Sequence, residues 1–261
     1  MQAFTKEEFI SKLKAIKKQG WILSHRQGND GGVGNTLEDL LGIKENNIPL
    51  ADWGVWELKT QRKNTSSLTT LFHVDPEPRK EGIISEILLP KYGWQHKEAG
   101  KKYPINEKSF RATLNGNACI DRGFKIVVDR EAQKVLISFD SEKSAPRHSA
   151  WLADVKKKVG LGEINPQPYW SFETLKKKLE EKVCNMFYVV VDNRGPKGNE
   201  EFLYSEAWEL SNPSFEKLLH GLETGSILID FDARTGHNHG TKFRMHQNTW
   251  IKLYDNIEKV L

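Results

Sequence analysis

Residues 51–60 read ADWGVWELKT, and this short stretch decides both the fold and the chemistry that the sequence predicts. Its second half is typical of a β-strand, in which successive side chains point to opposite faces. Glu57 and Lys59 therefore share one face of the expected strand. Trp56 and Leu58 point to the other face, where they are expected to anchor the strand in a hydrophobic core.

The acids around this strand are suited to holding a metal ion. Asp52 comes just before the strand, where a bend can bring its carboxylate beside Glu57. Two carboxylates and a neighbouring backbone carbonyl, that of Leu58, are the hard oxygen ligands that Mg²⁺ prefers. A lysine beside such a metal, here Lys59, can orient an attacking water and offset the charge of a phosphate. This Asp-x(n)-Glu-x-Lys arrangement occurs in metal-dependent nucleases, although an isolated E-x-K triplet is more typical of a solvated strand face.

A further acid lies upstream, on a short helix predicted over residues 36–42. Glu38 can supply another carboxylate to the same cluster, but acids favour the first turn of any helix, so a purely structural role stays open. Thr36 is expected to cap this helix and Gly42 to close it. The preceding stretch, residues 26–35, holds four glycines and is expected to be a loop; it matches neither the Walker A motif nor the dinucleotide fingerprint.

The rest of the pattern indicates a mixed α/β fold. Thr5 and Glu8 form a capping-box pair at the start of a helix predicted over residues 5–18. Asn212 and Pro213 are expected to start a helix over 213–223. The remaining expected elements are strands at 68–74, 187–192 and 226–233, a hairpin over 124–140, a helix at 171–183 and a terminal helix over 250–261. The polar segment 91–117 is expected to be an insertion or a lobe boundary. Because strands and helices alternate irregularly, we expect a mixed sheet flanked by helices.

Composition bounds the class of protein. The 261 residues suit one large domain or two small ones, and 38% hydrophobic residues argue against whole-chain disorder. The sequence has no apolar run long enough for a membrane helix, and its charged amino terminus does not resemble a signal peptide. Cys119 and Cys184 are too few for a disulfide framework or a zinc site, which suggests a reduced, cytosolic setting. The net charge of +4 is too small to identify a partner.

The distribution of charge near the carboxy terminus is more informative. Residues 233–254 contain four Lys or Arg, three His and no acid, which suits a phosphate backbone. At the start of this stretch, Asp232 and Arg234 lie two residues apart and therefore share one face of a predicted strand. Arginine can bond guanine O6 and N7 together, and a carboxylate can accept from cytosine N4. His237 and Arg244 follow. The alternative for His237 and His239 is a plain pair of loop histidines or a metal site with only two ligands.

Three stretches of the sequence carry a family resemblance. Residues 28–62, GNDGGVGNTLEDLLGIKENNIPLADWGVWELKTQR, together with LTTLFH at 68–73 and LYDNIEKVL at 253–261, resemble the MvaI/BcnI family of Type II restriction endonucleases, and the BcnI branch most closely. The similarity spans most of the chain but is looser over residues 76–200. The resemblance implies a restriction-endonuclease-like fold related to that of the repair nickase MutH, with two lobes around a DNA cleft.

The resemblance also implies roles for named residues. Asp52, Glu57 and Lys59 match the catalytic triad, and Glu38 matches an acidic residue of the same active site. The family's recognition segment is an Asp-x-Arg pair followed by H-x-x-G-x-x-x-R. The matching residues here, which the resemblance expects to read bases, are Asp232, Arg234, His237 and Arg244. The loop between Arg234 and His237 is shorter than in other members of the family. His73 matches a histidine that works with the one at His237 on the central base pair, and this pairing favours CC(C/G)GG over an A/T-centred site.

The expected protein is thus a prokaryotic, cytoplasmic enzyme that cuts double-stranded DNA with Mg²⁺, which Mn²⁺ can replace, at one or two metal positions. It is expected to be a monomer that nicks the two strands in turn, accompanied genetically by a cognate methyltransferase. We expect a single chain, 1–261, with a catalytic lobe mainly over 1–75 with parts of 120–190, and a recognition lobe mainly over 200–261 with His73. The alternatives are a strand-specific repair nickase like MutH and a DNA-binding protein without catalysis.

Overall fold

The computed structural model describes residues 5–25, 31–43, 47–50, 54–78, 82–196 and 198–261. The chain forms two compact units that interleave along the sequence. The first unit comprises Met1–Ser67, Val183–Ser214 and His246–Leu261, and the second comprises Leu68–Lys182 and Phe215–Met245. Among the described residues, no helix has both the length and the apolar character needed to cross a membrane.

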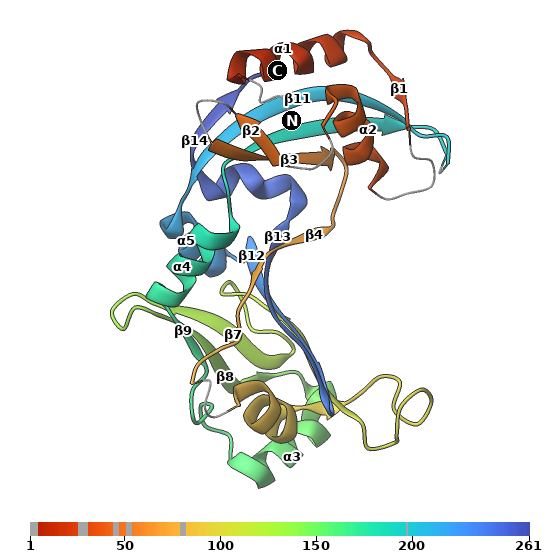
Figure 1. The fold of residues 1–261 in the computed structure, drawn as a ribbon. Coiled ribbons are helices and arrows are strands. Elements are labelled where there is room, and N and C mark those ends of the chain that lie inside the picture. Colours follow the sequence, from red (N-terminus) through yellow and green to blue (C-terminus); the bar gives the residue numbers. More distant parts are fainter. Residues whose placement is uncertain (1–4, 26–30, 44–46, 51–53, 79–81, 197) are drawn as a thin grey trace. The chain divides into compact units, whose positions relative to one another are not determined.

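The first unit is built on a mixed six-stranded sheet (Figure 1). In spatial order its strands are β1 Ile22–Leu23, β11 Glu201–Pro213, β10 Met186–Arg194, β3 Gly54–Arg62 and β2 Asn47–Leu50, and β14 Tyr254–Lys259 also pairs with β11. β10 runs parallel to β3, and the other pairs described here are antiparallel. The expected mixed sheet flanked by helices is therefore confirmed.

Two helices contribute to the core of this unit. The first, α1 Lys6–Lys18, begins with the predicted capping box: the Glu8 amide donates to Thr5 Oγ1 (3.1 Å) and the Thr5 amide donates to Glu8 Oε2 (2.8 Å). Its buried face and that of α2 Gly32–Leu41 pack with Trp56 and Leu58 of β3. The prediction that these two side chains anchor the strand is confirmed, since they are 2% and 4% exposed.

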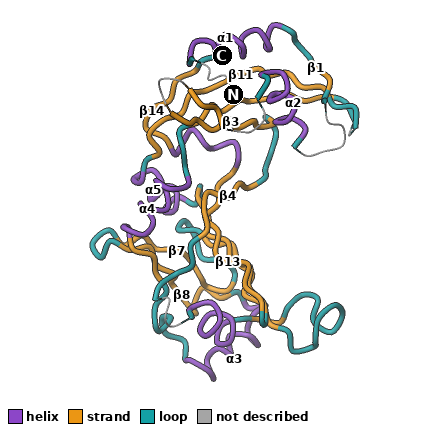
Figure 2. The backbone as a smooth tube through the Cα atoms, in the orientation of Figure 1, coloured by secondary structure: helices purple, strands orange, loops and turns teal. Residues whose placement is uncertain are grey.

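The second unit contains two sheets. The five-stranded sheet has the order β4 Leu68–His73, β13 His237–His246, β12 Ile227–Arg234, β6 Lys108–Leu114 and β5 Trp94–Gln95. The three-stranded sheet contains the predicted hairpin, β7 Arg122–Asp129 and β8 Lys134–Ser144 (Figure 2), and β9 Tyr169–Ser171, which pairs with β8. The helical segments are the π-helix Ile83–Tyr92, the 3₁₀ turn Pro146–His148, α3 Ser149–Val159, α4 Phe172–Lys182 and α5 Phe215–Thr224.

Three local predictions about helices were wrong. Thr36 lies inside α2, fully buried, and its Oγ1 accepts a hydrogen bond from the His25 amide, because the helix already begins at Gly32. Asn212 and Pro213 belong to β11, and α5 begins at Phe215. The carboxy-terminal segment forms the 3₁₀ turn Gln247–Leu253 and then strand β14, because β11 offers it a free edge.

The segment 91–117 is not an insertion outside the fold. Within it, β6 pairs with β12 along six residues and carries the buried side chains of Phe110 and Leu114. The two units also differ from the expected lobes. Residues 120–182 pack with the five-stranded sheet, whereas 200–214 and 246–261 pack with β3, since β10 and β11 complete the sheet around that strand.

Candidate active site

The catalytic candidates Glu57 and Lys59 lie side by side on β3. Their side chains are 25% and 36% exposed, and Lys59 Nζ lies 2.5 Å from Glu57 Oε1. The strand is held in place by β10, since the Glu57 amide donates to the carbonyl of Asn185 at 3.0 Å. Alternation along the strand thus gives the acid and the lysine a common face, as predicted, and an ion pair orients the ammonium group.

A cavity of about 620 Å³ in the first unit opens beside these residues. Glu38 of α2 and Leu58 and Lys59 of β3 line it, so the structure brings the expected additional acid to the same place as the lysine. The helix lies close to the strand at Gly34: a Cβ atom there would stand 3.2 Å from Thr60 Oγ1 and 3.8 Å from Glu38 Oε1. Part of the glycine-rich stretch predicted as a loop is therefore helix packed on the catalytic strand.

The oxygen donors in and beside this cavity are of the kind that a hard divalent cation takes. Glu38 and Leu58 line the cavity, and Glu57 contacts Lys59, which also lines it. Asp52, the remaining predicted ligand, lies outside the described residues. Within the described part of the chain, His, Cys, Asp and Glu form no group of three suited to a metal. The three-ligand set Asp52, Glu57 and Leu58 stays a prediction.

Tyr254, which the sequence did not single out, lies buried near Glu57. Burial, reinforced by the negative charge of Glu57, raises the pKa of Tyr254 well above its usual range, so the phenol stays neutral. Its hydroxyl donates to the carbonyl of Cys184 at 2.7 Å. Tyr254 was missed because its segment was predicted to be a helix, whereas β14 carries it into the sheet that holds Glu57.

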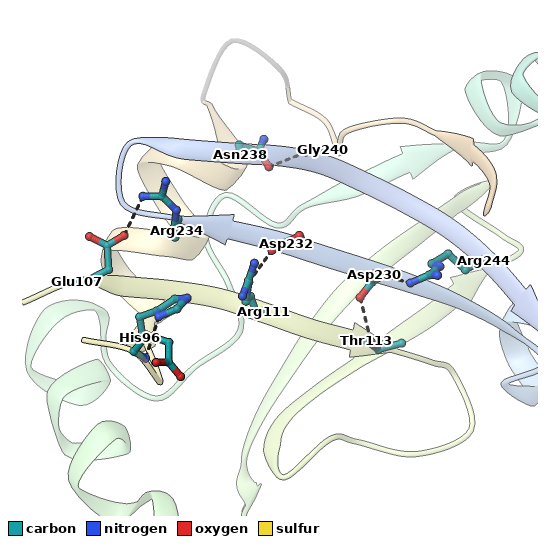
Figure 3. Close-up of polar contacts among 11 residues, drawn as sticks. His96, Glu107, Arg111, Thr113, Asp230, Asp232, Arg234, Asn238, Gly240 and Arg244 are labelled. Atoms are coloured by element: carbon teal, nitrogen blue, oxygen red, sulfur yellow. Dashed lines mark hydrogen bonds and ion pairs between the residues drawn. The ribbon is translucent and has the colours of Figure 1, made fainter. Parts of the chain in front are cut away.

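The predicted reading residues belong to the second unit. On β12, alternate side chains are buried, and the others, including Asp230, Asp232 and Arg234, form one polar face with neighbouring β6 (Figure 3). Arg234 Nη1 lies 3.3 Å from Oε1 of the buried Glu107, and its guanidinium is 4.7 Å from the centre of the Tyr103 ring. The predicted sharing of a face by Asp232 and Arg234 is therefore confirmed, and Glu107 is an unpredicted partner.

The other arginine of the predicted set, Arg244 on β13, is held at both terminal nitrogens. Its Nη1 lies 3.0 Å from Asp230 Oδ2, and its Nη2 donates to the carbonyl of Leu68 at 3.3 Å. Asp230 also accepts a hydrogen bond from Thr113 of β6 (Figure 3). Asp230 could have been recognised from the sequence, because the run ILIDFDAR places it two residues before Asp232 on the same strand face.

Both predicted histidines are exposed at strand ends. His237 begins β13 and lies opposite Arg234 across a tight turn, and its ring is 4.2 Å from that of His239. His73 ends β4 beside β13, where a Cβ atom on Gly240 would be 3.6 Å from His73 Nδ1. The structure thus puts both histidines on adjoining strands, and their joint action on one base pair stays a prediction.

Comparison with known proteins decides the family. The sequence profile of the MvaI/BcnI restriction endonuclease family matches residues 10–254. The chain belongs to this family. It is therefore a Type II site-specific deoxyribonuclease, as the motifs around Glu57 predicted.

Solved structures of this family share the fold. The MvaI restriction endonuclease in complex with its cognate DNA substrate is 22% identical, with a TM-score of 0.61 over 97% of this chain and 96% of that one. MvaI without DNA is 21% identical, with a TM-score of 0.62 over the full length of both chains. No curated protein matches the chain significantly. The expected restriction-endonuclease-like fold is confirmed.

Proposed function

We propose that this MvaI/BcnI-family enzyme hydrolyses double-stranded DNA with Mg²⁺ at a short pseudopalindromic site of the CCNGG type, with CC(C/G)GG favoured. The observation that carries the proposal is the Glu57–Lys59 ion pair beside a cavity that Glu38 also lines. DNA as the substrate is supported by the family and by the similar MvaI, which has been solved with its cognate DNA. The presence of histidine at both His73 and His237 favours the C/G-centred site.

In the proposed reaction, Asp52, Glu57 and the Leu58 carbonyl would hold the cation, and Glu38 would assist. A bound divalent cation supplies Lewis-acid stabilisation of the charge that develops on the phosphate. Lys59, oriented by Glu57, positions the attacking water by hydrogen bonding and offsets the same charge. The water oxygen bonds to phosphorus in line with the 3′ oxygen, which leaves and takes up a proton. One water is consumed per bond, and the ends are 5′-phosphate and 3′-hydroxyl.

The test is digestion of a sequenced plasmid with purified protein and Mg²⁺, followed by mapping of the ends. We expect cuts at CC(C/G)GG and none when EDTA replaces the metal. Glu57→Gln should abolish cutting yet keep binding to the same duplex in Ca²⁺, because it removes a ligand charge without removing a reading residue. An intact plasmid that contains CC(C/G)GG sites would overturn the specificity, and a Glu57→Gln variant that still cuts would overturn the active-site assignment.

A further inference from the structure

An arginine outside the family motifs occupies the middle of the polar face formed by β6 and β12. Arg111 of β6 is directly opposite Asp232 in the antiparallel register, and its side chain is 42% exposed. Its Nε lies 2.5 Å from Asp232 Oδ1 (Figure 3). The residue predicted to read cytosine therefore shares its carboxylate with an arginine from a segment 121 residues away.

The geometry of this pair leaves Arg111 with N–H donors, and Asp232 with an acceptor oxygen, that can bind a ligand. Among the described residues, the contact of Arg111 runs through Nε to Asp232 Oδ1, which leaves the edge with the two terminal nitrogens available. The neighbouring arginines differ, because Arg244 uses both terminal nitrogens and Arg234 uses Nη1 on Glu107. In the same way, Asp232 keeps a second carboxylate oxygen as an acceptor.

This arrangement of donors and acceptor matches one base pair. In the major groove a G·C pair presents guanine N7 and O6 as acceptors and, beside them, the cytosine N4 amino group as a donor. A guanidinium fixed at Nε presents two parallel N–H groups, which suit a bidentate bond to N7 and O6. Neighbouring strands lie about 4.8 Å apart, so a guanidinium and a carboxylate on adjacent strands can address the two bases of one pair.

We propose that Arg111 is a further specificity-determining residue, which donates to guanine while Asp232 accepts from cytosine N4 of the same base pair. The inference rests on the proposed function and deepens it. It also gives the segment 91–117 a place in sequence reading. The contact with Asp232 orients Arg111 before DNA arrives, which reduces the ordering cost of binding.

The test pairs Arg111→Ala with duplexes in which 7-deazaguanine, which lacks the N7 acceptor, replaces one guanine of the cleaved site at a time. Binding is measured with Ca²⁺ in the Glu57→Gln background. We expect Arg111→Ala to weaken binding to the unmodified site by about 10- to 100-fold. It should also remove the effect of 7-deazaguanine at one position and leave the effect at the other guanines intact.

Two further variants make the result specific. Arg111→Lys keeps the charge but loses the bidentate bond, so it should behave like Arg111→Ala. Arg130→Ala removes another exposed arginine of the second unit that is paired with carboxylates, Glu216 and Glu223, and should bind every duplex like the parent. Circular dichroism of all variants checks that the fold is retained.

The other outcomes separate this inference from the proposed function. If Arg111→Ala weakens binding to all sequences equally and Arg111→Lys restores it, Arg111 contacts phosphate and the inference is overturned. If the variant keeps its sensitivity to 7-deazaguanine at every position, Arg111 only supports Asp232, and the inference is again overturned. In both cases the wild type still cuts its site. If the wild type cuts no CCNGG duplex, the proposed function itself fails and the inference fails with it.

Discussion

At the scale of single residues, the ion pair between Lys59 and Glu57 carries the proposed chemistry. Replacing Lys59 by Met removes the cation that orients water and offsets phosphate charge, so we expect the single-turnover cleavage rate to fall by about 100-fold or more, with DNA binding retained. The matched control is Lys63→Met. Lys63 follows the same strand, is 52% exposed, and pairs at 3.8 Å or longer with Glu206 and Asp192. A Lys59→Met variant that cuts at the wild-type rate would remove Lys59 from the mechanism.

At the scale of elements, the β7–β8 hairpin depends on a glycine at an irregularity in its pairing. Gly123 has φ +81°, and a Cβ atom there would lie 2.1 Å from the carbonyl oxygen of Asp140. We expect Gly123→Ala to lower the free energy of unfolding by about 2 kcal/mol or more, because backbone strain and a clash combine. Gly160→Ala is the control: φ is +83° but no atom lies within 4 Å, so a loss of about 1 kcal/mol is expected. The free energies of unfolding are measured by urea denaturation. If Gly123→Ala and Gly160→Ala lose the same stability, the backbone around residue 123 relieves the clash by shifting, and the prediction is wrong.

The start of β7 also carries a pH-dependent contact. Asp121 Oδ2 lies 2.8 Å from His148 Nε2 and 2.5 Å from Arg147 Nη2. The hydrogen bond with His148, with further help from Arg147, lowers the pKa of Asp121 below its usual value. A carboxyl with a lower pKa in the folded chain stabilises the fold above the unfolded pKa of about 3.9, and this stabilisation is lost as the pH falls through the folded pKa. We therefore expect Asp121→Asn to destabilise the protein at pH 5, and we expect this loss of stability to shrink progressively towards pH 2. Denaturation curves between pH 5 and pH 2 measure the difference in the free energy of unfolding between the wild type and Asp121→Asn. A difference that grows as the pH falls would contradict the prediction.

At the scale of the whole molecule, one chain contains one Glu57–Lys59 pair, whereas cutting a duplex requires two hydrolytic events. The family resemblance predicts a monomer, and a monomer has to nick one strand, reorient on the pseudosymmetric site and then cut the other. A supercoiled plasmid with one site should pass through an open-circular intermediate before it becomes linear, at a rate proportional to enzyme concentration. Direct conversion to linear DNA, with a rate that rises as the square of the concentration, would instead indicate a dimer. Persistent nicking of one strand alone would favour the repair nickase.

The sequence by itself determined which face of its own strand each side chain occupies. The alternation in WELK put Trp56 and Leu58 in the core and Glu57 and Lys59 on the opposite face. The same period of two predicted the β7–β8 hairpin and the polar face of β12. These features were readable because the direction of a side chain follows from its own strand's backbone, whatever the strand pairs with.

Only the tertiary structure decided which strands lie together. Arg111 meets Asp232 across a gap of 121 residues, and no short-range pattern could show that a polar segment supplies the strand beside β12. The apolar spacing of residues 250–261 is compatible with a helix, yet the open edge of β11 makes it a strand and brings Tyr254 near Glu57. Strand pairing satisfies backbone hydrogen bonds between distant parts of the chain, so it is settled by which edges remain open once the core has packed.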